Sequence, residues 1–343
     1  MEVIASVLEH ARMRHIFVAL GRGGEVELKL RSLGADVRCL EEKTKIPSLG
    51  AIKSLLKLFL CERPLVVHTH GAEANFHGLI AAWLARVPVR IGEEIGIPSH
   101  GRRAKAVFRL IYGTVHRVVG ISQSVTDWLI ASREVSRRKA IRIYNPVQLP
   151  ELKENMVQPD IFRIGFVGRL EPVKNPLALL EAFDVISASG ISSELWFVGD
   201  GSERIALRER ISQMGLTEKV KLWGYQSDPA ELVRQCHVYV QPSLSEGFGL
   251  ALVEAMGCGV PVISTAVGGA PEIIKHGRTG WLLPEASPAL IAGALNEAWR
   301  IGPNKLQEMG LQARKSVEGR FEPTYYLERI ESLYSELIEE NGR

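Results

Sequence analysis

The sequence predicts an α/β protein with two domains, each built on a doubly wound parallel sheet. Short apolar, β-branched strands alternate with helical patterns along all 343 residues, which is typical of parallel sheets with crossover helices. That length also exceeds what one hydrophobic core usually serves. A segment with two prolines and little periodicity, residues 145–155, separates two alternating series. We therefore expect an N-terminal domain over residues 1–150 and a C-terminal domain over residues 151–343.

The first series contains six predicted strands with helical patterns between them. The apolar strand runs are His15–Leu20, Asp36–Leu40, Leu65–His68, Val87–Ile91, Arg117–Gly120 and Ile141–Ile143, and the helical patterns lie near residues 25–33, 48–61, 73–86, 101–112 and 124–132.

The second series repeats this alternation and ends in helices. Its strands are predicted near residues 162–167, 194–198, 219–223, 237–240, 260–263 and 280–282, followed by helical patterns at 287–300, 304–317 and 324–340. We expect the last helix to pack back on the N-terminal domain.

Composition excludes several classes of protein. With 46% apolar and 24% charged residues the chain is globular. Its longest apolar runs are much shorter than the ~18–20 residues needed to span a bilayer. The first residues carry Glu2, Glu9 and His10, so no secretory signal peptide is expected. The four cysteines are scattered without metal-ligand spacing, which predicts buried thiols in a reducing cytoplasm and no zinc site.

Charge is distributed unevenly along the chain. Residues 1–150 carry a net charge of +10 and residues 151–343 a net charge of −7, which favours an anionic partner for the first domain. An anionic membrane surface fits, whereas no aromatic-basic interleaving suggests nucleic acid. The helix at 48–61, with Lys53 and Lys57, has the pattern of a membrane-skimming helix, but a sheet-covering helix has the same pattern. Simple solvation of the basic residues is the alternative.

One segment, residues 245–264, carries most of the chemical information. Glu246 and Glu254 flank a turn containing Gly247 and Gly249 that opens a helix. Glycines let backbone amides approach a ligand, and a helix start favours phosphate. Carboxylates suit hydroxyls instead, so the segment predicts a ligand with both groups, such as a nucleotide sugar. The two catalytic carboxyls of a glycosidase lie about 5–9 Å apart. Eight helical residues span roughly 12 Å, so Glu246 and Glu254 are expected to lie too far apart for such a pair. Two ordinary helix glutamates are the remaining alternative.

Four turns of the second domain follow predicted strands. Because ligands of open parallel sheets bind beyond the carboxyl ends of the strands, these turns should form one pocket. Within them, Arg169 and Lys174 supply cations suited to a diphosphate. The turns are residues 168–175, 199–203, 224–225 and 242–249, and we assign Gly168, Gly199 and Gly224 to the binding of the ligand.

Familiar nucleotide and metal motifs are absent from the sequence. No Gly-x-Gly-x-x-Gly opens a helix with an acid about 20 residues later, and there is no Walker loop. No Asp-x-Asp pair is placed to hold a metal. We therefore expect no metal and no cofactor beside the donor itself.

These motifs resemble those of glycosyltransferase family 4, retaining enzymes with the two-domain GT-B fold. The resemblance is most specific in residues 168–175 and in the Glu-x7-Glu block, and moderately so in residues 67–71, 143–147, 198–201 and 268–272. It implies two Rossmann-like domains facing across a cleft. It further implies that the donor diphosphate is bound by Arg169 and Lys174, the ribose by Glu254 and the donor sugar by Glu246, with backbone support from Phe248, Gly249 and Leu250.

The resemblance also implies an activity. The enzyme would transfer a sugar from a UDP- or GDP-linked donor to a saccharide or lipid-linked acceptor hydroxyl, with retention and without a protein nucleophile. Polysaccharide or glycolipid assembly, in the cytoplasm or on the inner face of the membrane, is the implied setting. A nucleotide-sugar-binding protein without turnover is the main alternative. A phosphorylase or an epimerase on the same scaffold is a third.

Two departures from the family pattern stand out. Family members begin with a strand and a Gly-Gly turn, whereas Met1–Ser6 has the pattern of the helix that follows. We expect either a missing first strand, through a late start or truncation, or that residues 15–24 replace it. Secondly, Ile95 occupies the position of an expected histidine. Glu93, Glu94 or His100 could replace it, and His68 and His70 lie at a predicted strand end.

Overall fold

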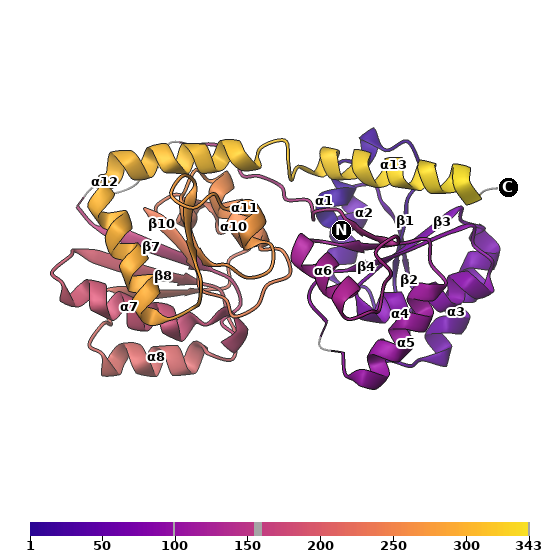
Figure 1. The fold of residues 1–343 in the computed structure, drawn as a ribbon, viewed down its shortest axis with the longest axis horizontal. Coiled ribbons are helices and arrows are strands. Elements are labelled where there is room, and N and C mark those ends of the chain that lie inside the picture. The colour runs from indigo at the N-terminus through magenta and orange to yellow at the C-terminus, as the bar shows by residue number, and fades with distance from the viewer. Residues whose placement is uncertain (99, 154–159, 342–343) are drawn as a thin grey trace. The chain divides into compact units, whose positions relative to one another are not determined.

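The computed structural model describes residues 1–98, 100–153 and 160–341. They divide into two compact units (Figure 1). The N-terminal unit consists of Met1–Pro146 together with Phe321–Arg343, and the C-terminal unit of Val147–Arg320. We predicted residues 321–343 as part of the second domain, with the last helix packing back on the N-terminal domain; the described residues of this segment, 321–341, belong to the N-terminal unit. Part of the predicted linker, residues 154–155, lies outside the described residues.

The C-terminal unit contains a six-stranded parallel sheet in the order β12-β11-β10-β7-β8-β9. The chain starts in the middle, at β7, proceeds to one edge and returns to add β10 on the other side of β7. Ligands of such sheets bind where this reversal occurs, beyond the ends of β7 and β10. The strands are β7 (Phe162–Val167), β8 (Ser193–Val198), β9 (Val220–Gly224), β10 (Val238–Gln241), β11 (Val262–Thr265) and β12 (Gly280–Leu283).

Helices cover this sheet and enclose its core. The central strands are almost continuously apolar, as is typical of a parallel sheet covered by helices, and they include the fully buried Phe166 and Phe197. The long helix α12 is interrupted at Gly302, whose φ of 80° is not helical. The helices are α7 (Pro176–Ala188), α8 (Arg204–Gln213), α9 (Ala230–Val233), α10 (Leu250–Gly257), α11 (Ala270–Ile273) and α12 (Pro288–Val317), with a 3-10 turn, η2 (Pro172–Lys174).

The N-terminal unit contains two separate parallel sheets. A four-stranded sheet has the order β3-β4-β5-β6, and β1 pairs with β2 in a sheet of two strands. Among the described residues, no strand joins β1 to β3. The strands are β1 (Ile16–Ala19), β2 (Asp36–Cys39), β3 (Val66–His70), β4 (Val89–Glu94), β5 (Arg117–Gly120) and β6 (Ala140–Arg142).

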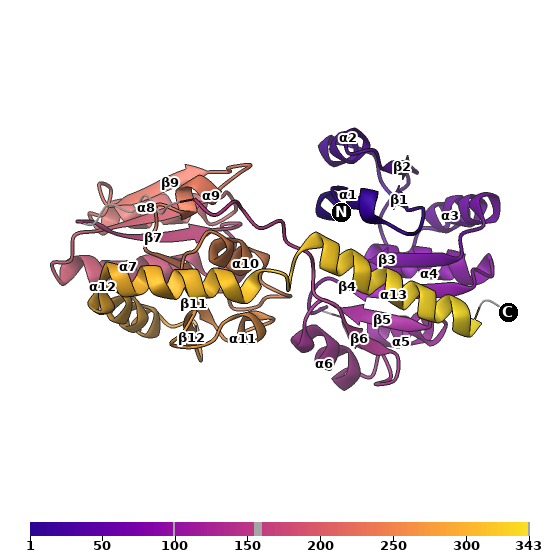
Figure 2. The ribbon, with the colours of Figure 1, turned by 90° about the horizontal axis from the view of Figure 1, so that it is seen from above.

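The helices of the N-terminal unit include one, α13, from the C-terminal end of the chain. The C-terminal helix α13 (Pro323–Asn341) packs against β4 and against the short first helix (Figures 1 and 2). Its buried side chains, including Tyr326, Ile330 and Tyr334, share a core with Val89 and Ile91. The others are α1 (Glu2–Ala5), α2 (Glu25–Ser32), α3 (Leu49–Glu62), α4 (Ala72–Leu84), α5 (Arg102–Gly113) and α6 (Gln123–Ala131), with a 3-10 turn, η1 (Leu8–His10).

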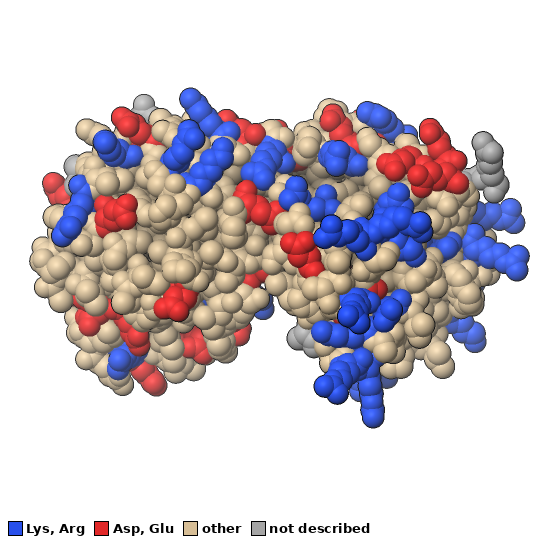
Figure 3. Space-filling model, viewed as in Figure 1, with Lys and Arg blue, Asp and Glu red and all other residues tan. Residues whose placement is uncertain are grey.

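The place of α13 changes the charge asymmetry. This helix is acidic, so the N-terminal unit carries a net charge of +6 and the C-terminal unit −3. Figure 3 shows acidic side chains over the end of α13 and basic ones over the lower part of the unit, where α5 lies. The basic excess of the N-terminal unit is therefore smaller than the net charge of residues 1–150 suggests. The thiols also differ from the expectation, because Cys61 is exposed.

Candidate functional site

The loop after β7 carries two cationic side chains, one exposed to solvent and one paired with a carboxylate. Arg169 is exposed, and its guanidinium makes no ion pair with any side chain in the described part of the chain. Lys174 ends the 3-10 turn η2, and its Nζ lies 2.5 Å from Oε1 of Glu246. The two predicted cations thus follow the same central strand, and one is bonded to a predicted carboxylate.

Glu246 is the centre of a small hydrogen-bond network at the end of β10. Its Oε1 accepts hydrogen bonds from Gln241 Nε2 (2.8 Å) and Ser243 Oγ (2.6 Å) as well as from Lys174. Its side chain is only 9% exposed, so these donors offset the cost of burying the charge. Since β7 and β10 are adjacent, their loops meet, and the amide of Leu244 donates to the carbonyl of Val173. Gln241 and Ser243 were not predicted, although both are polar residues at a strand end.

The predicted binding glycines allow neighbouring loops to touch. A Cβ on Gly199 would collide with the carbonyl oxygen of Gly168, and Gly199 has a φ of 140°. The amide of Gly199 donates to the carbonyl of Gly224, and that of Gly168 to the carbonyl of Val198. These glycines therefore hold the turns after β7, β8 and β9 together. This packing explains their presence without a ligand.

Helix α10 begins beside this network. Gly249 precedes it with a φ of 104°, a conformation that favours glycine. The backbone N–H groups of Leu250 and Ala251 make no hydrogen bond within the described residues, as is normal at a helix start. Phe248 is buried, and backbone of the segment 246–248 packs against Gly268 and Gly269, where any Cβ would collide with it. The helix start is thus held in place with donors available for an anion.

Glu254 lies one turn further along α10. Its side chain is exposed, yet enough protein surrounds the carboxyl that desolvation raises its pKa. The carboxyl has no hydrogen bond or ion pair with the described residues. A solvent-accessible but crowded, unpaired carboxyl is suited to accept hydrogen bonds from hydroxyls of a ligand. All ten predicted site residues therefore lie in the C-terminal unit, at the carboxyl end of β9, on the turns after β7, β8 and β10, and on α10.

The candidates for the missing histidine lie in the N-terminal unit, and each has protein partners. Ile95 itself is exposed. Glu94 is buried and bonded to Tyr112 and Asn75, and burial raises its pKa although these bonds oppose the shift. His100 Nδ1 lies 3.0 Å from a carboxyl oxygen of Glu134. Neither Glu94 nor His100 is free to act without breaking these bonds.

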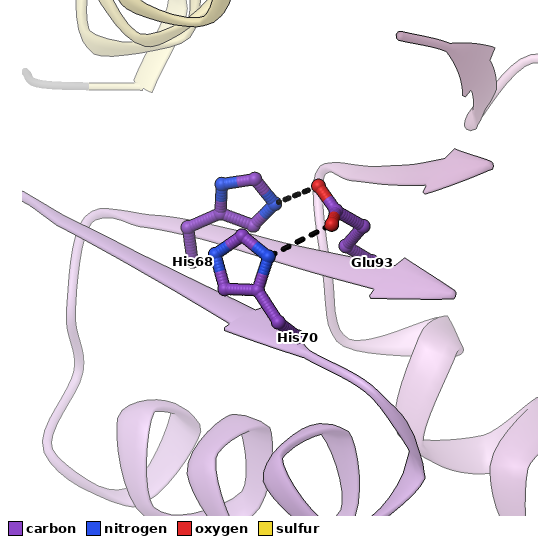
Figure 4. Close-up of side chains that lie close together, drawn as sticks. All are labelled: His68, His70 and Glu93. Atoms are coloured by element: carbon purple, nitrogen blue, oxygen red, sulfur yellow. Dashed lines mark hydrogen bonds and ion pairs between the residues drawn. The ribbon is translucent and has the colours of Figure 1, made fainter. Parts of the chain in front are cut away.

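Glu93 forms a cluster with both histidines of β3. Its Oε1 lies 2.8 Å from His70 Nδ1, and its Oε2 lies 3.4 Å from His68 Nε2 (Figure 4). Burial acts to raise the pKa of Glu93, but the adjacent His70 and His68 outweigh it and hold that pKa well below its usual range. Burial lowers the pKa of His68, and the neighbouring His70 adds to the effect. The three side chains are also the one described group whose ligand atoms lie close enough to hold a metal ion.

None of the described helices is long and apolar enough to cross a bilayer.

Two family models match nearly the whole chain. Residues 3–150 match the model described as Glycosyltransferase Family 4, and residues 151–316 match the one described as Glycosyl transferases group 1. The chain is similar to the capsular polysaccharide biosynthesis glycosyltransferase CapM of Staphylococcus aureus, with 28% identity over 87% of this chain and 84% of CapM. It is also 28% identical to an Escherichia coli UDP-Gal:α-D-GlcNAc-diphosphoundecaprenol α-1,3-galactosyltransferase, over 85% of this chain and 81% of that enzyme.

Solved structures support the same architecture. Anabaena HepE, crystallised with UDP, superposes with a TM-score of 0.83 at 22% identity, covering 98% of this chain and 96% of HepE. A glycosyltransferase from Rickettsia africae superposes with a TM-score of 0.85 at 19% identity, covering 98% and 93%. At these identities the likeness establishes the fold, and the predicted pair of parallel-sheet α/β domains is confirmed.

Proposed function

This chain belongs to glycosyltransferase family 4, and from that premise we propose that it transfers a sugar from a UDP- or GDP-linked donor to an acceptor hydroxyl with retention. The donor lies on the C-terminal unit, at the ends of β7 and β10. The observation that carries this proposal is the contact between Lys174 and Glu246 at this edge of the sheet, with Arg169 on the same loop as Lys174 and the start of α10 just after Glu246. HepE, which shares this fold, was crystallised with UDP.

Charge on the departing diphosphate is the chemical problem that these groups address. As the bond to the sugar breaks, negative charge builds on the phosphate oxygen. Arg169 has no competing carboxylate among the described residues, so its guanidinium is available to grip two phosphate oxygens. Lys174 keeps two further N–H donors beside the one given to Glu246. Groups fixed in advance where charge develops stabilise a transition state more than flexible ones.

Two carboxylates would bind the ends of the donor. Glu254, unpaired and accessible, accepts hydrogen bonds from the ribose hydroxyls. Glu246 holds its Oε1 in the network with Lys174, Gln241 and Ser243, which leaves Oε2 for a sugar hydroxyl. A diphosphate bound by the remaining N–H donors of Lys174 would share that ammonium with Glu246, so donor binding and the orientation of Glu246 are coupled.

We propose that donor binding needs no metal ion, because protein cations take the role that magnesium has in other enzymes. The expected result is the same affinity for the nucleoside diphosphate in Mg²⁺ and in EDTA, measured by isothermal titration. An affinity that falls at least tenfold in EDTA would contradict this part of the proposal.

The acceptor is expected to be a saccharide or lipid-linked hydroxyl in polysaccharide or glycolipid assembly, the setting named for CapM and for the galactosyltransferase. We also propose a cytoplasmic location at the inner membrane face. The surface of α5 supports this, because it exposes Arg102, Arg103 and Arg109 beside Leu110, which is 75% exposed. Anionic vesicles should float the protein at low salt and less at high salt. The double variant Arg102→Glu/Arg103→Glu should no longer float with the vesicles, whereas Arg208→Glu on α8 should float like the wild type. This difference would place the membrane contact on α5.

The decisive experiment measures donor turnover. A thermal-shift panel of nucleotide sugars first identifies the donor, and its consumption is then followed with and without acceptor. Arg169→Ala should lower kcat by about 10²–10³-fold, as for loss of one charge-stabilising donor. Arg208→Ala, an exposed arginine of α8, is the matched control and should leave kcat unchanged. An unchanged rate in Arg169→Ala would reject the proposed role.

The divided sheet of the N-terminal unit favours one alternative, a nucleotide-sugar-binding protein without turnover. That protein would bind the donor through the same C-terminal residues. It would show a thermal shift with the donor but neither transfer nor slow hydrolysis.

A further inference from the structure

The ends of β3 and β4 bring two histidines and a glutamate onto one face of the N-terminal sheet. Residues His68 and His70 alternate with buried Thr69 along β3, so both rings lie on the same face. His70 is paired in register with Glu93 on β4. Figure 4 shows both imidazole rings turned toward the two oxygens of that carboxylate.

Burial makes this cluster unusual. The side chains of His68 and Glu93 are only 6% and 3% exposed, and that of His70 is 25% exposed. Nε2 of His68 is buried and has no hydrogen-bond partner among the described residues, since its approach to Glu93 at 3.4 Å lacks hydrogen-bond geometry. A buried polar atom left unsatisfied is costly. Nε2 of His68 faces the carboxylate of Glu93, and the imidazole of His70 faces the same carboxylate.

The distances fit a small ion. With bonds of about 2.0–2.2 Å and tetrahedral angles, ligand atoms lie roughly 3.4 Å apart. One ligand atom from each side chain lies within 4.8 Å of the other two. Nδ1 of His70 lies 2.8 Å from Oε1 of Glu93, and Nε2 of His68 lies 3.4 Å from Oε2. The partly exposed His70 leaves a route for an ion from solvent.

Neighbouring hydroxyls from α13 orient two of the ligands. Tyr334 Oη lies 2.8 Å from Nδ1 of His68, which leaves Nε2 facing the cluster. Tyr326 Oη donates to Oε2 of Glu93 at 3.5 Å. Outer partners of this kind fix the ring orientation and tautomer of metal-binding histidines.

We propose that His68, His70 and Glu93 form a binding site for one divalent transition-metal ion of the Zn²⁺ class. Two imidazoles and one carboxylate suit Zn²⁺, Fe²⁺ or Co²⁺, whereas Mg²⁺ and Ca²⁺ prefer oxygen ligands. Three protein ligands leave at least one position open for water or another molecule. The ion would tie β3 to β4 in the N-terminal unit, and it has no part in the donor site proposed for the C-terminal unit.

The test titrates the full-length, tag-free, chelator-treated protein with Zn²⁺ by calorimetry and with Co²⁺ by visible absorption. We expect one ion per chain and the d–d absorption of Co²⁺ in a site containing nitrogen ligands. His70→Ala, at the most exposed position of the three, should weaken Zn²⁺ binding by at least 10–100-fold, the range found even for loss of outer-shell partners. His10→Ala, at an exposed histidine 3.6 Å from Glu9, is the matched control and should bind like the wild type.

Three results would overturn the proposal. These are a wild-type protein that takes up no stoichiometric ion, a Co²⁺ spectrum of an all-oxygen site, or His70→Ala binding as tightly as the wild type. The wild-type spectrum needs no variant, so the proposal stays falsifiable even if His70→Ala fails to fold. None of these results depends on glycosyl transfer.

Discussion

Substitution of Glu254 by Gln should change stability and ligand binding in opposite directions. The ionised carboxyl is unpaired among the described residues and crowded by protein, and burial raises its pKa. The folded protein therefore holds this proton more tightly than the unfolded chain does. Ionisation of Glu254 then lowers the free energy of unfolding at neutral pH, and this cost disappears as the pH falls through the folded-state pKa. The Glu254→Gln substitution removes the charge, so the ligand-free variant should melt no lower than the wild type at pH 7–8, with a difference that shrinks on acidification.

The same change should weaken nucleotide binding. A hydrogen bond to a charged group contributes about 1.5–3 kcal/mol, and each 1.4 kcal/mol is about a factor of ten in Kd. Loss of one such bond to the ribose predicts a Kd about 10–150-fold higher for the nucleoside diphosphate. Calorimetric titration and thermal melts between pH 5 and 8 measure both effects, with Glu308→Gln on α12 as the control. An unchanged Kd in Glu254→Gln would refute the ribose contact, and a clear loss of ligand-free stability would refute the view that the carboxyl is unpaired.

Three further predictions concern other parts of the structure. Lys174→Met and Glu246→Gln should each lower the free energy of unfolding. The loss in the double variant should be smaller than the sum of the two single losses by about 1–3 kcal/mol. Additive losses in denaturation experiments would show that the 2.5 Å contact contributes little to stability. Gly199→Ala should lower the free energy of unfolding by about 3 kcal/mol or more, because the added Cβ would collide with the carbonyl of Gly168. Gly190→Ala, where the added Cβ meets open space, should lower it by about 1 kcal/mol. Equal melting temperatures for the two variants would contradict the packing of the loops. Glu331 is buried, and although burial raises its pKa, His15 and the amides of Arg12 and Met13 hold that pKa below its usual value. Its contribution to stability should thus be present above the unfolded pKa and be lost as the pH falls through the folded one, and an acid midpoint that does not change in Glu331→Gln would argue against it.

The sequence predicted the strands well where they are apolar and less well where they end in polar residues. The interior strands β7 and β5 match their predicted bounds, because β-branched and aromatic runs suit a sheet covered on both faces. The prediction ended β3 at His68 and β4 at Ile91, whereas the structure continues them to His70 and Glu94. Histidine and glutamate do not signal a strand in the sequence, because what stabilises them there is a contact with a distant side chain. The extensions carry His70 and Glu93, two of the three residues of the His68–His70–Glu93 cluster.

Contacts between distant residues limited what the sequence could predict of the site. Arg169, Lys174, Glu246 and Glu254 were recognisable because each lies in a turn or helix of distinctive pattern. The bond from Lys174 to Glu246 joins residues 72 positions apart, and the pairing of His70 with Glu93 spans 23 positions. Nothing local marks such partners. The expectation of no metal relied on local spacing, which does not reveal that His68, His70 and Glu93 come together from two strands.

A crystal structure of the protein with a nucleoside diphosphate would show whether the C-terminal unit binds this ligand at the ends of β7 and β10. We expect the diphosphate within hydrogen-bond distance of Arg169, Lys174 and the amides at the start of α10, with the ribose hydroxyls on Glu254. A nucleotide bound elsewhere, or bound here with Arg169 and Glu254 turned to solvent, would contradict it.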